Sequence, residues 1–163
     1  MIDQALVREL FHYDEGSGVV TWRVSPAHRV KVGDVAGWLG ENGYWYVSIR
    51  SRKFLLSRVI WLYMTGAWPV SKIDHQDVDS TNNRWPNLRE ATHSQNEMNK
   101  GARGGKRTNK AGVKGVYFHK NRWCAEIRAD GKRHYLGRHL TKEAAAGAYR
   151  AAAQRLHGQF ARI

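Results

Sequence analysis

The chain has 163 residues, which is enough for one ordinary domain or two very small ones. Its 27 Lys and Arg residues outnumber 14 Asp and Glu residues, so the formal net charge is +13. This excess favours a polyanionic partner, although ribosomal proteins and membrane-surface binders have a similar balance. The single cysteine, Cys124, excludes an intramolecular disulfide and a cysteine-rich zinc site.

The N-terminal segment is charged from Asp3 onward and lacks the apolar core of a signal peptide. The longest apolar run, VIWLYM, is far shorter than the ~20 residues that span a bilayer. We therefore expect a soluble cytoplasmic protein with no membrane partner.

The positive charge lies almost entirely in the second part of the chain. Residues 1–96 carry 11 Lys and Arg against 10 Asp and Glu, whereas residues 97–163 carry 16 against 4. The net charges are thus +1 and +12. This asymmetry predicts that the second part binds phosphate and brings the nearly neutral first part to the polyanion.

The first half alternates between short helices and strands. Apolar residues at helical spacing predict a helix over residues 3–12 with Asp3 as its cap. A strand is expected at 19–23, and an aromatic hairpin at 44–49 and 53–55 around Ser51. A helix over 57–66, ended by Gly66, is expected to brace the elements that follow.

Residues 73–100 contain the densest chemistry. We expect a strand that includes Asp74 and His75, a polar turn over 77–83, a second strand over 88–91 and then a helix. Thr92 and Gln95 have the spacing of a capping box, and Gly101 follows as a stop. This order places Asn96 in the first helical turn, where it can face back toward the hairpin.

These side chains together form a candidate hydrolytic site. Asp74 and Asn96 supply the oxygen ligands that suit one hard divalent cation, Mg²⁺ or Mn²⁺. A histidine is largely neutral at cellular pH, so His75 can take a proton from an attacking water, and Asn87 can orient its ring. Taken singly, each residue is more common as a turn or cap residue; the prediction depends on all four at this spacing.

Residues 74–96 contain, in order, DH, then NN-R-x-x-NLR, then Thr with xxQN at a helix start. This pattern resembles the ββα-metal fold of HNH endonucleases, especially the phage homing type. The resemblance implies His75 as general base, Asn87 as its orienting residue, and Asp74 with Asn96 as ligands of one metal ion. It also implies cleavage of double-stranded DNA, in the bacterial host cytoplasm if the protein is phage-encoded. One departure is Ser57, which precedes Arg58 where relatives often have a histidine.

Residues 101–112, GARGGKRTNKAG, combine four glycines with basic residues, which is typical of a flexible linker. The basic side chains of this linker, Arg103, Lys106 and Arg107, are candidate DNA contacts. A purely solvated tether is an equal alternative.

Residues 113–163 are predicted to form a three-stranded antiparallel sheet packed on one helix. Strands are expected at 114–119, 122–129 and 132–139, with a strong turn signal at Asp130-Gly131. Thr141 can cap a helix whose alanine-rich stripe lies close against the sheet. One face of the sheet should then pack on the helix while the charged face stays open.

This part contains five short runs in the following order: GV, W-x-A-E-I-R, Y-L-G, T-x-E-A-A and A-Y-x-x-A-A. Together they resemble the APETALA/ethylene-response-factor DNA-binding domain. The resemblance implies a sheet that enters the major groove. The implied DNA-binding residues are Tyr117, His119, Arg122, Glu126, Arg128, Arg133 and Tyr135.

The sequence therefore predicts an α+β protein: a mixed αβ nuclease domain over 1–100 with its ββα-metal motif at about 70–100, a linker over 101–112, and a DNA-binding domain over 113–163. The predicted function is site-specific, metal-dependent DNA endonuclease activity, with nicking or double-strand cleavage by a monomer or homodimer and no other protein partner. The alternative is a DNA-binding regulator that retains an inactive nuclease scaffold.

Overall fold

The computed structural model describes residues 1–100 and 112–161. Contacts divide the chain into two compact units, residues 1–92 and 93–163. This division counts the short helix after residue 92 with the second unit, whereas the predicted domain limit is residue 100. The domain limits themselves stay predictions.

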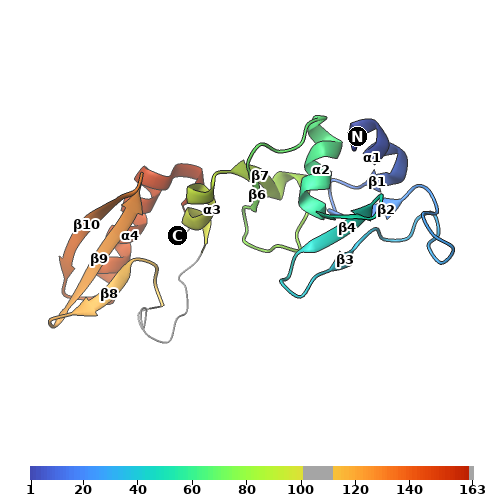
Figure 1. The fold of residues 1–163 in the computed structure, drawn as a ribbon. Helices are drawn as coiled ribbons and strands as arrows, with labels where there is room; N and C mark the ends of the chain where they lie inside the picture. Colours follow the sequence, from blue (N-terminus) through green and yellow to red (C-terminus); the bar gives the residue numbers. More distant parts are fainter. Residues whose placement is uncertain (101–111, 162–163) are drawn as a thin grey trace. The chain divides into compact units, whose positions relative to one another are not determined.

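The first unit is a mixed αβ assembly (Figure 1), and its buried apolar side chains form one core. Its elements are α1 (Gln4–Leu10), β1 (Phe11–Tyr13), β2 (Val20–Trp22), β3 (Trp38–Leu39), β4 (Trp45–Ile49), β5 (Arg52–Leu55), α2 (Leu56–Thr65), β6 (Lys72–His75), the 3-10 turn η1 (Trp85–Asn87) and β7 (Leu88–Ala91).

Three small antiparallel sheets make up this unit within the described residues: β1-β2, β3-β4-β5 and β6-β7. Helix α1 begins as predicted, with the Asp3 carboxylate accepting a hydrogen bond from the backbone N–H of Leu6 at 2.9 Å. It ends at Leu10, so the predicted extension to residue 12 is wrong: Phe11 and His12 pair with Trp22 and Thr21 instead.

Helix α2 braces the β6-β7 hairpin, as predicted. The Arg58 guanidinium donates to the backbone carbonyls of Ser71 and Pro69, at 2.9 and 3.1 Å, and so holds the segment that leads into β6. The ring of Trp61 lies 5.2 Å from that of Trp85 in η1. Ser57 is buried in this helix.

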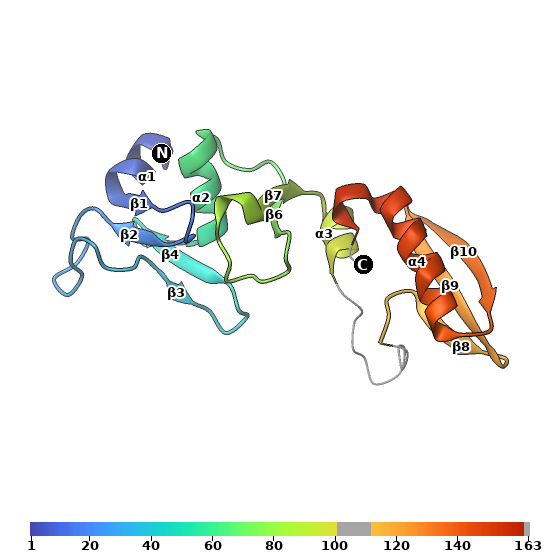
Figure 2. The same cartoon turned by 180° about the vertical axis from the view of Figure 1, so that it is seen from behind.

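The second unit contains α3 (His93–Asn99), β8 (Val116–His119), β9 (Arg122–Ala129), β10 (Lys132–His139), α4 (Lys142–His157) and η2 (Gly158–Phe160). The strands form one antiparallel sheet in the order β10-β9-β8. Figures 1 and 2 show α4 running along one face of this sheet, and its alanines pack on Val116, Ala125 and Ile127. The predicted α+β class and the three-stranded sheet packed on a helix are confirmed.

Among the described residues, no helix has both the length and the apolar character needed to cross a bilayer.

Candidate nuclease site and outer sheet face

Asp74 and His75 end strand β6, and both side chains are buried. Strand β7 pairs with them in antiparallel register, so that Asp74 lies opposite Arg89 and His75 opposite Leu88. Residues opposite each other in a sheet share a face. Asp74 therefore shares a face with Arg89, while His75, the next residue along the strand, points to the other face.

The Asp74 carboxylate is held by an ion pair across the two strands. Its Oδ2 accepts from Arg89 Nε at 2.9 Å and Nη2 at 2.8 Å. The two side chains are only 5% and 12% exposed, respectively, so water screens this attraction weakly. Arg89 thus fixes the orientation of the carboxylate.

The His75 ring contacts an amide that the sequence did not single out. Its Nε2 lies 3.2 Å from Oδ1 of Asn83, and both side chains are buried. The ring of Tyr44 lies 6.2 Å away, measured between centroids. Because Oδ1 only accepts hydrogen bonds, Nε2 carries the hydrogen in this contact.

Asn87, predicted to orient the histidine ring, makes its hydrogen bonds within the loop between the strands. Its Nδ2 donates to Asp77 Oδ1 at 3.0 Å and to the Asn82 carbonyl at 2.7 Å. Its Oδ1 accepts from the backbone N–H of Asp77 at 3.0 Å. Asn87 therefore closes the loop between the strands.

Asp77 is the acceptor around which this loop is organised. Partial burial raises the pKa of its carboxyl, but hydrogen bonds from Asn82, the Asp79 N–H and Asn87 outweigh that effect and lower the pKa below its usual value. The carboxylate is thus the form that the folded loop prefers.

The N-terminal strands support the loop from the other side. The Tyr13 hydroxyl donates to the Asn83 carbonyl at 2.8 Å. Burial, aided by the negative charges of Glu15 and Asp14, raises the pKa of Tyr13, so the hydroxyl keeps this proton. Gly18 has φ +78°, and a Cβ there would collide with the backbone of Asn83 and Arg84. The loop is therefore packed against residues far away in the sequence.

In the second unit, the predicted DNA-contacting side chains share the sheet face opposite α4. The register pairs Tyr117 with Cys124, His119 with Arg122, Arg133 with Arg128, and Tyr135 with Glu126. Ala125, Ile127 and Ala129 point the other way into the core. We call this open side the outer face; its residues are Tyr117, His119, Arg122, Cys124, Glu126, Arg128, Arg133, Tyr135 and Arg138.

Glu126 lies within this basic face and is satisfied by its neighbours. Tyr117 donates to its Oε2 at 3.2 Å, and Arg133 Nε lies 3.6 Å from the same oxygen. Desolvation, with the Glu126 charge beside it, raises the pKa of Tyr117, which keeps the hydroxyl a donor.

Arg138 belongs to the outer face, although strict alternation from Arg133 and Tyr135 would put it on the inner one. The pairing register shifts between Tyr135 and Arg138, so that Arg138 lies opposite Cys124. Gly137, with φ +105°, lies within this irregularity. A glycine in a strand is the signal that could have indicated such a bulge.

Three predicted DNA contacts, Arg103, Lys106 and Arg107, lie outside the described residues.

Comparison with known proteins decides what the β6-β7 segment is. Residues 54–98 match the HNH endonuclease family. This stretch of the chain is thus similar to an HNH endonuclease domain. The match runs from β5 to α3 and includes Asp74, His75, Asn83, Asn87 and Asn96.

The chain is also similar to an uncharacterized HNH endonuclease of Acanthamoeba polyphaga mimivirus, with 36% identity over 126 residues. The aligned part is 76% of this chain, and it spans 64% of the relative's length. No solved structure matches the chain significantly.

Of the predicted HNH site residues, Asn96 lies in the second unit, half-buried on α3. Its role as a metal ligand stays a prediction. A carboxylate and an amide fit Mg²⁺ or Mn²⁺ in ligand type, because these ions prefer oxygen and keep several waters. The described residues contain no cluster of three or more His, Cys, Asp or Glu side chains able to hold a metal ion.

Proposed function

We propose that the protein is a site-specific, metal-dependent DNA endonuclease of the homing type that hydrolyses phosphodiester bonds. The observation that carries the proposal is the buried His75 ring, bonded to Asn83 and adjacent to the ion-paired Asp74, within a segment that matches the HNH family. A solvated turn has no need for such a support.

His75 acts as the general base in this proposal. In this role a nitrogen of the imidazole ring takes the proton from the attacking water. Asn83 stabilises the charged ring that results, since its Oδ1 faces the Nε2 hydrogen.

Asp74 and Asn96 hold one Mg²⁺ or Mn²⁺. When bound, such an ion stabilises the negative charge that builds up on the phosphate and the leaving oxygen. The ion pair with Arg89 keeps the Asp74 carboxylate oriented before the ion arrives.

The outer face of the C-terminal sheet binds double-stranded DNA. It carries Arg122, Arg128, Arg133 and Arg138 against a single carboxylate, Glu126. Four guanidiniums on a flat, open face suit phosphate and guanine contacts. The resemblance to the APETALA/ethylene-response-factor domain supports the same role for Tyr117, His119 and Tyr135, and the basic segment with Arg103, Lys106 and Arg107 would add phosphate contacts.

Plasmid cleavage tests the proposal. Supercoiled DNA is incubated with Mg²⁺ or Mn²⁺ and the wild type, His75→Ala, or His28→Ala, an exposed histidine in the first unit that serves as matched control. We expect metal-dependent relaxation by the wild type and H28A but not by H75A, with 5′-phosphate and 3′-hydroxyl ends. A monomer with one site should nick first.

Duplex binding by the wild type without metal-dependent cleavage would instead favour the alternative, a DNA-binding regulator with an inactive nuclease scaffold. Cleavage that H75A retains would exclude the proposed base.

A further inference from the structure

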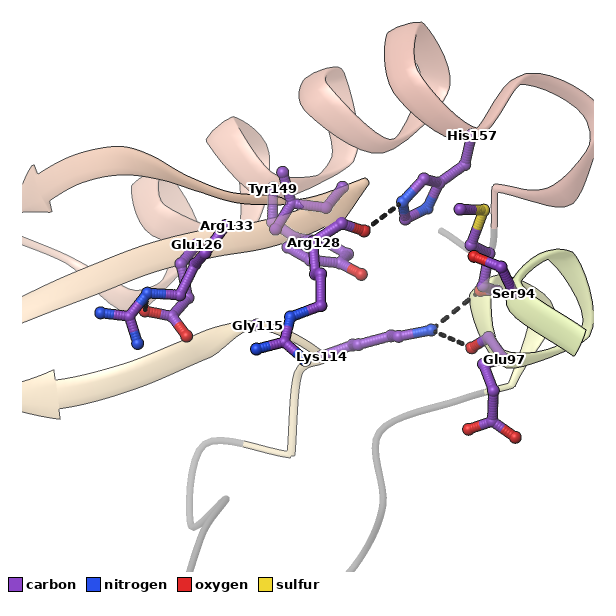
Figure 3. A pocket seen from close by; sticks show the side chains of 11 residues that line it. Ser94, Glu97, Lys114, Gly115, Glu126, Arg128, Arg133, Tyr149 and His157 are labelled. Atoms are coloured by element: carbon purple, nitrogen blue, oxygen red, sulfur yellow. Dashed lines mark hydrogen bonds and ion pairs between the residues drawn. The ribbon is translucent and has the colours of Figure 1, made fainter. Parts of the chain in front are cut away.

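The last residues of helix α3 are held by one lysine. The ammonium group of Lys114 donates to the carbonyl oxygens of Glu97, Met98 and Lys100, each at 2.8 Å. Figure 3 shows the extended Lys114 side chain reaching the end of α3 beside Glu97. All of these residues belong to the second unit.

This contact supplies hydrogen-bond donors to the C-terminal end of the helix. The final carbonyls of any α-helix have no partner within it, and they carry the negative end of the helix dipole. Two of the bound carbonyls, those of Glu97 and Met98, belong to α3, and that of Lys100 follows directly after it; an ammonium group has three donors, one for each. Helix α3 has only seven residues, and helices this short are marginal in water without outside contacts.

The backbone next to Lys114 is fixed on the sheet. Gly115 accepts a hydrogen bond from the Glu126 N–H at 2.8 Å. Its φ is +68°, and a Cβ would collide with the Glu126 carbonyl and the ring of Tyr149. Lys114 therefore extends from an anchored point.

A cavity of about 390 Å³ lies between α3 and the sheet, lined by Ser94, Glu97 and Met98 on one side and by Arg128, Tyr149 and His157 among others on the opposite side. His157 is 7% exposed; its Nε2 lies 3.0 Å from the Arg128 carbonyl, while its Nδ1 has no partner. The two sides are thus not packed flush here. Lys114 bridges a gap that apolar packing leaves open.

We propose that Lys114 is a positioning residue for the nuclease site. By capping α3 it makes the DNA-binding unit the support of the helix that carries Asn96, so the sheet contributes to cleavage as well as to binding. The proposal rests on the proposed function, in which Asn96 is a metal ligand.

The test compares Lys114→Met with Lys132→Met in the full-length protein. Lys132 is an exposed lysine at the start of β10, so each change removes one positive charge and retains the length of the side chain. Three quantities are measured: amide hydrogen exchange of residues 93–99, affinity for a short duplex, and single-turnover cleavage at saturating DNA over a range of Mg²⁺ concentrations.

We expect K114M to speed exchange in α3, to lower the cleavage rate or the apparent Mg²⁺ affinity about 10- to 100-fold, and to bind duplex within about twofold of K132M. If a loss of duplex affinity accounts for the whole loss of cleavage, Lys114 acts only by binding phosphate, and the proposal is overturned. Unchanged exchange in α3 would overturn it too, as would faster exchange with unaltered cleavage.

The exchange measurement separates this inference from the proposed function. If the wild type binds duplex but does not cleave it with any of the metal ions, the proposed function fails and Lys114 has no nuclease site to position. In that case, amide exchange in α3 still shows whether Lys114 stabilises the helix.

Discussion

The contact between Asn83 and His75 gives the sharpest prediction about the chemistry. Replacing Asn83 by Ala removes an acceptor 3.2 Å from Nε2 but keeps the backbone carbonyl that binds Tyr13. A hydrogen bond to a group that becomes charged is worth about 1.5–3 kcal/mol. If this energy is lost in the transition state, the rate constant falls about 10- to 150-fold.

The assay is single-turnover cleavage of supercoiled plasmid at saturating protein and metal. Asn82→Ala is the matched control, because Asn82 is the adjacent residue and bonds Asp77 instead of the ring. Thermal unfolding confirms that both variants are folded. A cleavage rate in N83A equal to that of the wild type or of N82A would refute the assignment of Asn83 as the residue that orients His75.

Three further predictions concern stability and binding. Arg89→Ala leaves the buried Asp74 charge without its cross-strand partner and should lower the free energy of unfolding by about 3–5 kcal/mol in urea titrations; a change below about 1 kcal/mol would contradict a buried pair. Because the pKa of Asp77 is lowered on folding, its stabilising effect is present above the unfolded value of ~3.9 and is lost as the pH falls through the lower folded value. The wild type should therefore exceed Asp77→Asn in urea midpoint at pH 6, and this advantage should shrink toward pH 3; a constant difference would exclude titration of Asp77 as its cause. Arg128→Ala on the outer face should weaken duplex binding and reduce the slope of log K against log salt by ~1, whereas Arg150→Ala, exposed on α4, should leave the slope unchanged; equal slopes in both variants would argue against this face as the DNA contact.

Local signals in the sequence were sufficient for most elements of the fold. The strand limits at 88–91 and 122–129 agree with β7 and β9, because turn residues bound them on both sides. Phe11 shows where such signals fail. It continues the helical spacing of Leu6, Val7 and Leu10, but its ring lies 4.6 Å from that of Trp22, and strand pairing with a distant residue outweighs a local preference.

Within the site, the sequence indicated Asp74 and His75 on one strand but not which amide meets the ring. The loop contains Asn82, Asn83 and Asn87, and spacing alone does not say which of them points inward. The choice depends on Tyr13 and Gly18, which reach the loop from the start of the chain. Arg138 was missed for a related reason, since a shift of register at Gly137 reverses the alternation on which the prediction relied.

The hydrogen bond from Tyr13 to Asn83 joins residues 70 positions apart. The segment that matches the HNH family, residues 54–98, lacks Tyr13 and with it the hydroxyl that holds the Asn83 carbonyl. An excised 54–98 peptide would retain Asp74, His75 and Asn83, but it would lack the Tyr13 hydroxyl that holds Asn83 beside the histidine. Moving this segment into another protein therefore calls for the first strands of the chain as well, and contacts between residues so distant in sequence slow folding.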